Sequence, residues 1–378
     1  FFITSFSEAL GRFGLEAHFS TLQIVLPVGI SFYTFHGLSY VIDIYKNRIE
    51  PEKNFLDYAL FVCFFPLLVA GPIERATHLL PQIQSKRTFN YSKAVDGLRQ
   101  ILWGLFMKIV VADNCAIVVN EIFKDQSHYN APSLIIGAVL FAFQIYGDFS
   151  GYSNIALGSA KLFGIDLLKN FAFPYFSRDI AEFWRRWHIS LSSWFKDYLY
   201  IPLGGSKGGK WMQIRNTLII FVVSGFWHGA NWTFIIWGFL NALYIMPLVI
   251  FNLNRKNTNT VAEGRLLPNM KEFCQIIFTF AITVIAWVFF RSRTVADAFD
   301  YVGRIFTFNN YGWPQTDSKP FIFIAVLVIV EWFQRNKDHG LQIDNIKNIL
   351  VRWSIYAVFI LIILIFGANS DSFIYFQF

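Results

Sequence analysis

The sequence predicts an all-α protein that crosses a membrane several times as a helical bundle. Of its 378 residues, 55% are hydrophobic and 15% are charged, whereas a globular domain in water carries roughly 25% charged residues. The mean hydropathy is positive, at +0.43, and apolar stretches recur from Ile24 to Phe366 with no polar half between them. We therefore expect one membrane-embedded domain over residues 1–378.

Several stretches approach the length of about 20 apolar residues that a membrane-spanning helix needs. The clearest are residues 273–290 and 353–368, which carry no charge. Residues 214–251 are too many for one helix and predict two helices that meet near residues 225–231. The remaining candidates are short or contain Pro, Gly, His or charged residues, which favours packing inside the bundle. They are residues 24–42, 55–70, 101–119 and 321–330.

Residues 179–200 form a different pattern, in which apolar side chains recur at helical spacing and charged side chains occupy the other side. This pattern predicts an amphipathic helix. Asp179 and Glu182 can cap its start, and Pro202 ends it. An aromatic face opposite Arg and Lys suits an interfacial helix in the plane of the lipid headgroups. The alternative is a helix packed on the bundle with its basic side in water.

The net charge of +7 does not indicate nucleic acid as a partner. Lys and Arg are concentrated in short connections between apolar stretches, as membrane topology requires, so lipid headgroups are the expected anionic neighbours. We place the basic region 161–215 on the cytoplasmic side. The three cysteines are widely spaced and predict neither a disulfide framework nor a metal site.

Two histidines are the strongest candidates for chemistry. His228 lies between Gly225 and Gly229 in the longest apolar stretch, where ionisable residues usually line a cavity or a path. The glycines allow a substrate or another backbone to come close. His188 lies at the edge of the apolar stripe of the amphipathic helix, so we expect it at the boundary between bundle and interface, where it could line an entrance. The alternatives are a histidine bonded to a neighbouring helix at position 228 and an interfacial histidine without special role at position 188.

Asp148 is the third candidate, because it follows an apolar run and has Gly147 and Gly151 nearby. It could orient a histidine or hold a break in a helix together. The sequence has no HExxH or GxSxG motif, so soluble-hydrolase chemistry is not indicated. Residues 204–210 approach a phosphate-binding loop, but Trp211 replaces its hydroxyl residue and the loop follows a helix, so no nucleoside triphosphate site is predicted.

The chain carries five ordered motifs, namely Gly71-Pro72-Ile73-Glu74-Arg75, residues 144–152, residues 183–192, Tyr200-Ile201-Pro202-Leu203-Gly204-Gly205 and Gly225-Phe226-Trp227-His228-Gly229. Together they resemble the membrane-bound O-acyltransferase family, in particular its bacterial branch with alginate O-acetyltransferase. The closing residues 373–378 agree with that branch, and the resemblance covers the chain from about residue 26 onward. Members usually begin with further membrane helices, so we expect amino-terminal helices to be missing here.

The resemblance implies a bundle with a central tunnel, which an acyl donor enters from the cytoplasm and an acceptor hydroxyl from the far side. His228 matches the catalytic histidine of the family, and His188 matches a second histidine of this branch. A neutral imidazole can accept the proton of a hydroxyl that attacks a thioester, so we predict His228 as the general base. Trp227 or Asn231 could donate to the carbonyl oxygen. The residues predicted to contact substrate are Asp148, Trp184, Trp227 and Asn231.

The implied reaction moves an acyl group, first of all acetyl, to a hydroxyl of an exported cell-surface polysaccharide. The donor is acetyl-CoA or an acyl carrier thioester, and no bound cofactor is expected. The expected partners are the donor, the polysaccharide, membrane lipids and an extracytoplasmic acetyltransferase, and the expected location is the bacterial cytoplasmic (inner) membrane. D-alanyl transfer onto teichoic acid by the same fold is an alternative.

Two further classes fit the same composition, namely a polysaccharide or small-molecule transporter and a scaffold for secretion. Broken helices with buried polar residues also occur in transporters. The pairing of His188 with His228 favours the enzyme, because neither a transporter nor a scaffold requires those two histidines for acyl transfer.

Overall fold

The computed structural model describes residues 29–307 and 311–368, and every regular element within these ranges is helical. The start of the predicted stretch 24–42 and all of residues 373–378 lie outside the described residues. The helices are α2 (Ile30–Tyr45), α3 (Phe55–Val62), α4 (Ala76–Gln84), α5 (Tyr91–Leu105), α6 (Asp113–Lys124), α7 (Ala131–Leu162), α8 (Ile180–Arg186), α9 (Ile189–Phe195), α10 (Gly209–His228), α11 (Trp232–Ile250), α12 (Met270–Arg291), α13 (Val295–Ile305), α14 (Pro320–Phe333) and α15 (Ile349–Phe366). The shorter helical turns are η1 (Phe65–Leu67), η2 (Phe106–Ala112), η3 (Gln126–His128), η4 (Pro174–Phe176) and η5 (Lys196–Tyr200).

Five helical segments in the described part of the chain are long and apolar enough to cross a membrane, which confirms the predicted multi-pass helical bundle. The predicted spans at residues 273–290 and 353–368 correspond to α12 and α15, and residues 214–251 divide into α10 and α11 as expected. Residues 55–70 form the short helix α3 and the turn η1. The five segments are Tyr91–Lys124, Ala131–Leu162, Trp232–Ile250, Met270–Arg291 and Ile349–Phe366.

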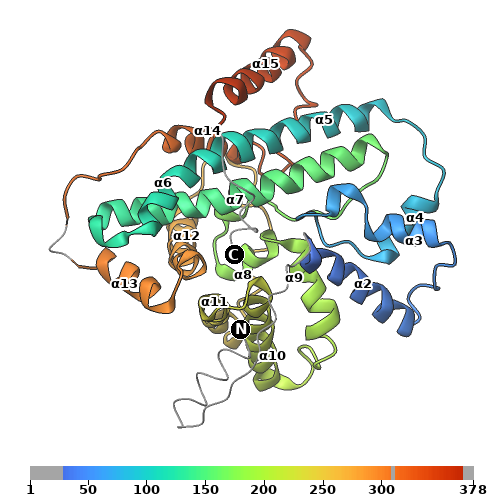
Figure 1. Ribbon diagram of the computed structural model, residues 1–378, viewed down its shortest axis with the longest axis horizontal. Helices are drawn as coiled ribbons and strands as arrows, with labels where there is room; N and C mark the ends of the chain where they lie inside the picture. Colours follow the sequence, from blue (N-terminus) through green and yellow to red (C-terminus); the bar gives the residue numbers. More distant parts are fainter. Residues whose placement is uncertain (1–28, 308–310, 369–378) are drawn as a thin grey trace, which may run out of the picture.

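Helices α5 and α7 lie side by side at the centre of the bundle (Figure 1). Glycines bring their backbones together, because a Cβ added to Gly97 would lie 2.7 Å from the carbonyl oxygen of Gly158. A Cβ added to Gly151 would lie 2.8 Å from the carbonyl oxygen of Gly104. Small residues allow such close approach between helices in lipid. The most apolar part of α7 is 83% buried, so this helix is surrounded by protein.

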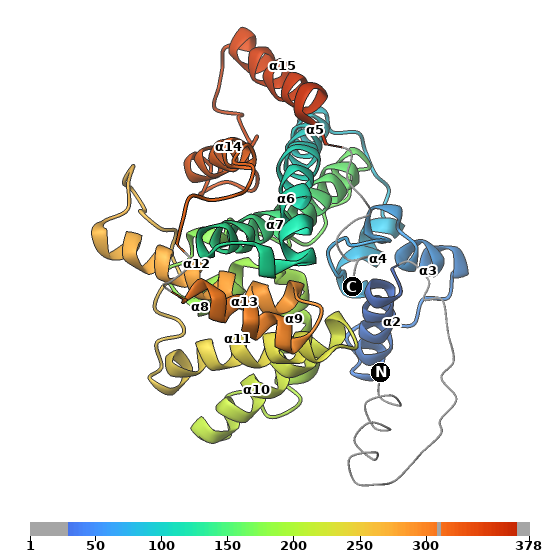
Figure 2. The ribbon, with the colours of Figure 1, turned by 60° about the vertical axis from the view of Figure 1, so that its left-hand side comes forward.

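Helices α10 and α11 form a hairpin with an equally close contact (Figure 2). A Cβ at Gly225 would lie 2.2 Å from the carbonyl oxygen of Phe234, and one at Gly238 would lie 2.2 Å from that of Phe221. The close approach predicted at the glycines around position 228 is thus made by the backbone of α11. This backbone contact holds the end of α10 against α11.

The predicted continuous helix over residues 179–200 is wrong, because the chain forms α8 and α9 with a break between them. The predicted start is confirmed, since the Asp179 side chain accepts a hydrogen bond of 2.7 Å from the Glu182 amide. The reciprocal bond of a capping box is absent at this position, because the Glu182 carboxylate accepts from the Arg178 amide at 2.8 Å. Both helices are largely buried, which favours the alternative of a helical segment packed on the bundle.

A tertiary hydrogen bond explains the break. The amide of Ile189 donates to the carbonyl oxygen of Asn170 at 2.9 Å, and the Ser190 hydroxyl donates to the Asn170 side chain at 2.5 Å. His188 consequently adopts the left-handed conformation, with φ 44° and ψ 53°. A continuous α-helix would instead direct the Ile189 amide to a carbonyl four residues earlier.

Candidate active site

A buried cavity of about 140 Å³ lies where α8 and α9 meet α10. His188 projects into it from the break between α8 and α9, and His228 from the last position of α10. The structure therefore brings the two predicted histidines to one cavity, although they are distant in sequence. Its other lining residues are Trp184, Trp187, Leu191, Ser192, Phe195, Ile220, Phe221 and Ser224.

His188 is 2% exposed, so its expected position at the boundary between bundle and interface is wrong. At the break between α8 and α9 the ring lies inside the protein and lines the cavity. Within the described residues, neither ring nitrogen of His188 has a hydrogen-bond partner. Burial lowers the pKa of His188 well below its ordinary value, and the nearby His228 acts in the same direction. The imidazole is thus neutral, with one donor and one acceptor nitrogen.

The backbone of His188 is strained, because a non-glycine residue in the left-handed region costs of order 1–3 kcal/mol. Such strain occurs most often at functional sites, where the surrounding structure over-determines it. Here the bonds from Ile189 and Ser190 to Asn170 impose it. The strained residue, His188, thus presents its side chain to the cavity.

His228 is surrounded by aromatic rings at the end of the α10–α11 hairpin. Its ring centroid lies 5.1 Å from that of Trp237 and 5.1 Å from that of Phe290. Trp227 stands between the two histidines, with ring centroids 4.7 Å from His228 and 6.2 Å from His188. The His228 ring is therefore packed among aromatic side chains.

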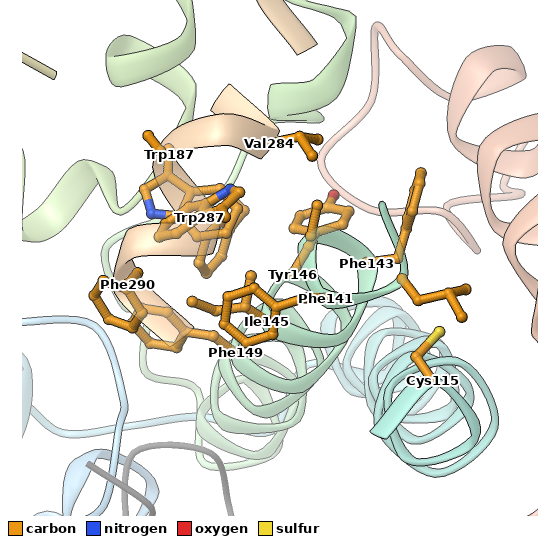
Figure 3. Packing of buried hydrophobic residues seen from close by; sticks show 14 of the residues in the cluster. Cys115, Phe141, Phe143, Ile145, Tyr146, Phe149, Trp187, Val284, Trp287 and Phe290 are labelled. Atoms are coloured by element: carbon orange, nitrogen blue, oxygen red, sulfur yellow. The ribbon is translucent and has the colours of Figure 1, made fainter. Parts of the chain in front are cut away.

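An aromatic cluster supports the cavity from the side of α7 and α12 (Figure 3). The rings of Trp187 and Trp287 lie 5.0 Å apart, and Trp287 lies 5.4 Å from Phe290. Phe149 of α7 contacts the His188 ring edge-to-face at 4.6 Å. Phe149 of α7 and Trp227 of α10 thus pack against the His188 ring, which suits a site that requires defined geometry.

Trp184 also lines the cavity, but its indole nitrogen donates to the Asn241 side chain at 3.3 Å. Asn231 is the cap of α11, where its side chain accepts from the Thr233 amide at 3.1 Å and donates to the Arg293 carbonyl at 3.0 Å. It is not among the lining residues. The predicted role of Asn231 as donor to the carbonyl oxygen stays a prediction.

Asp148 of α7 is not among the residues that line the histidines' cavity. Its carboxylate lies 2.7 Å from the ammonium of Lys108, which is also 2.9 Å from Asp113. Lys108 lies in the π-helical turn η2 that joins α5 to α6. Buried membrane carboxylates need such a partner, so Asp148 joins two helices. Its predicted substrate contact stays a prediction.

The sequence interpretation missed Ser192 and Ser224 as cavity residues. Their spacing could have identified them, because Ser192 lies four residues after His188 and Ser224 lies four residues before His228. Residues four apart share one face of a helix. The central tunnel stays a prediction, since what the structure describes is the cavity of about 140 Å³.

The fold and the cavity define a polytopic helical membrane protein with two histidines in a buried site. Residues 52–290 match the membrane-bound O-acyltransferase family, and the chain belongs to this family. This confirms the predicted resemblance and the prediction that the protein is an enzyme, an O-acyltransferase.

Three curated relatives illustrate the similarity. A probable alginate O-acetylase of Pseudomonas putida is 35% identical over 402 aligned positions, which cover 100% of this chain and 80% of the relative. A peptidoglycan O-acetyltransferase of Helicobacter pylori is 31% identical, with coverage of 100% and 78%. A teichoic acid D-alanyltransferase of Streptococcus thermophilus is 29% identical, with coverage of 70% and 66%. The chain spans 57% of the length of the probable alginate O-acetylases of Pseudomonas syringae and Pseudomonas aeruginosa.

Proposed function

We propose that this O-acyltransferase moves an acetyl group from a cytoplasmic thioester donor to a hydroxyl of an exported cell-surface polysaccharide. The single observation that carries the mechanism is the convergence of His188 and His228 on one buried cavity. The donor is acetyl-CoA or an acyl carrier thioester, and the acceptor class follows from the names of the relatives with the higher identities. The bacterial cytoplasmic membrane is the proposed location.

His228 acts as the general base in this proposal. The acceptor oxygen forms a bond with the thioester carbonyl carbon while His228 accepts the hydroxyl proton. The carbon–sulfur bond then breaks, and the imidazolium returns the proton to the leaving thiolate. The neutral His188 donates its N–H to the carbonyl oxygen as negative charge develops there, a role in which one donor is worth about 10²–10³ in rate.

D-alanyl transfer is the second candidate, because a teichoic acid D-alanyltransferase also aligns over 70% of this chain. A carrier thioester and coenzyme A present the same reacting group, so the histidines serve either donor. Membranes that contain the protein should transfer label from acetyl-CoA to purified polysaccharide if the first candidate is right. Transfer from a D-alanyl carrier thioester and not from acetyl-CoA would favour the second candidate, D-alanyl transfer.

The mechanism is tested by replacing His228 with Ala and measuring the O-acetyl content of the exported polysaccharide. We expect acetylation to be lost while membrane abundance and polymer export stay normal. His128→Ala is the matched control, since the His128 side chain is 78% exposed and outside the cavity. Unchanged acetylation in His228→Ala would refute the role of this base.

The role of His188 is tested with His188→Asn, because Asn tolerates the left-handed conformation better than other residues. The backbone should therefore stay intact while the imidazole is removed. We expect a rate loss of about 10²–10³ with little change in KM. A change confined to KM would contradict stabilisation of the transition state by His188.

A further inference from the structure

Helix α15 is the least buried of the candidate membrane spans, and a groove separates part of it from α5. The most apolar part of α15 is only 6% buried, and the helix lies at the edge of the bundle in both views (Figures 1 and 2). Its carboxyl end is held, because the Asn114 side chain donates to the Phe366 carbonyl at 2.9 Å. The groove toward its amino end has a volume of about 670 Å³, within the range of roughly 300–1,000 Å³ for small-molecule sites.

The groove has an apolar part and a cationic part. Leu98, Leu102 and Leu105 of α5 face Ile360 of α15 along its apolar length. Its charged lining residues are Arg99 and Arg352, and none of the described residues that line it is acidic. This combination fits a ligand with a hydrocarbon chain and an anionic group.

The two arginines are not equivalent. The charge of Arg99 is compensated, because its guanidinium forms an ion pair with Asp344 and its Nε donates a hydrogen bond to the Tyr356 hydroxyl at 2.7 Å. The Nε of Arg352 is buried and has no hydrogen-bond partner within the described residues. A buried donor without an acceptor is unfavourable, and the Arg352 side chain as a whole is only partly buried. Arg352 is therefore the arginine of the groove that is open to an anionic ligand.

Aromatic side chains place Arg352 at the level of the lipid headgroups. Tyr91 begins α5 and is 76% exposed, and Trp353 lies beside Arg352 in α15 and is 65% exposed. Exposed Trp and Tyr at helix ends mark the boundary between hydrocarbon and water. The cationic end of the groove thus lies at that boundary, and its leucines lie deeper.

We propose that the groove between α5 and α15 binds one anionic phospholipid of the surrounding bilayer. Its phosphate contacts the Arg352 guanidinium, and one acyl chain lies along Leu98, Leu102 and Ile360. A second groove of about 350 Å³ on α15 is lined by Leu350, Val351, Ser354, Ile355, Val358 and Phe359 and carries no charged residue. It should therefore accept hydrocarbon without selecting a headgroup. The lipid fills the surface that α15 does not bury against protein.

The proposal is tested by native mass spectrometry of the purified full chain with phosphatidylglycerol and phosphatidylcholine of identical acyl chains. We expect the wild type to retain one phosphatidylglycerol under conditions that remove phosphatidylcholine. Arg352→Gln should lower the apparent affinity for phosphatidylglycerol roughly tenfold, since it removes a charge-assisted hydrogen bond, and Arg352→Lys should keep most of it. Lys347→Gln is the matched control, because it removes a nearby exposed charge that does not line the groove.

A second variant tests the apolar part. Leu98→Trp should exclude the acyl chain and lower retention of phosphatidylglycerol with Arg352 intact, so the test stands even if Arg352→Gln does not fold. Equal retention of the two lipids by the wild type, or unchanged retention in both Arg352→Gln and Leu98→Trp, would overturn the proposal. A dimer across α15 that retains neither lipid would also overturn it and assign the groove to a second copy.

Discussion

The contact between α10 and α11 predicts that one methyl group at Gly225 impairs catalysis three residues away. A Cβ at this position would lie 2.2 Å from the Phe234 carbonyl oxygen, whereas real Cβ contacts are essentially never below 3.0 Å. The hairpin must therefore open by at least about 0.8 Å, the difference between these two distances. Because the obstacle is backbone, rotation of a side chain cannot relieve it. Displacement of about 1 Å in an active site can reduce the rate on the order of 10²-fold.

The assay is acetyl transfer by membranes that contain Gly225→Ala at wild-type abundance. We expect a loss of about 10²-fold in kcat/KM, without unfolding, since Ala is favoured over Gly in a helix by ~1 kcal/mol. Gly303→Ala in α13 is the matched control, because its Cβ would meet nothing within 4 Å. A Gly225→Ala enzyme with full activity would refute the argument that the hairpin positions His228.

Two further predictions concern charged groups away from the cavity. Lys108→Met removes the cation between Asp113 and Asp148 and should destabilise the fold by about 3–5 kcal/mol. The measurement is the Tm in detergent, which we expect to fall. An unchanged Tm would contradict the pairing. The hydrogen bond that the His78 ring donates to the Glu74 carboxylate raises the pKa of His78. Protonated His78 therefore stabilises the fold below its ordinary pKa of 6.5, and this contribution is lost as the pH rises through the raised pKa. The Tm difference between wild type and His78→Gln should therefore be largest in acid and vanish in alkali, and a difference independent of pH would exclude this ion pair.

Periodicity and composition were sufficient to predict the elements whose pattern repeats. The uncharged stretches at residues 273–290 and 353–368 are helices because lipid requires every backbone group to be bonded within its own segment. The junction between α10 and α11 was also predictable, since polar residues and glycines interrupt an apolar run there. These features depend on neighbours in the sequence.

The break at His188 was not predictable in this way. The apolar stripe continues through Trp187 to Leu191 without interruption, so the pattern favours one helix. The bonds that divide it come from Asn170, outside that stripe. The burial of His188 follows from this tertiary contact, and the sequence interpretation therefore placed the residue at a boundary. The histidines themselves were found because imidazoles in apolar stretches are rare and costly.

The burial of α7 also has a consequence for how the protein is made. A helix that leaves the translocon alone exposes its polar residues to lipid, and for Asp148 near the middle of a span this costs roughly 2.5–3.5 kcal/mol on insertion scales. Lys108, which neutralises Asp148, is synthesised earlier in the chain. The segment that contains Lys108 is therefore already present when α7 emerges, and the two segments can enter the bilayer as a pair. The two segments thus form a helical hairpin whose loop is residues 125–130.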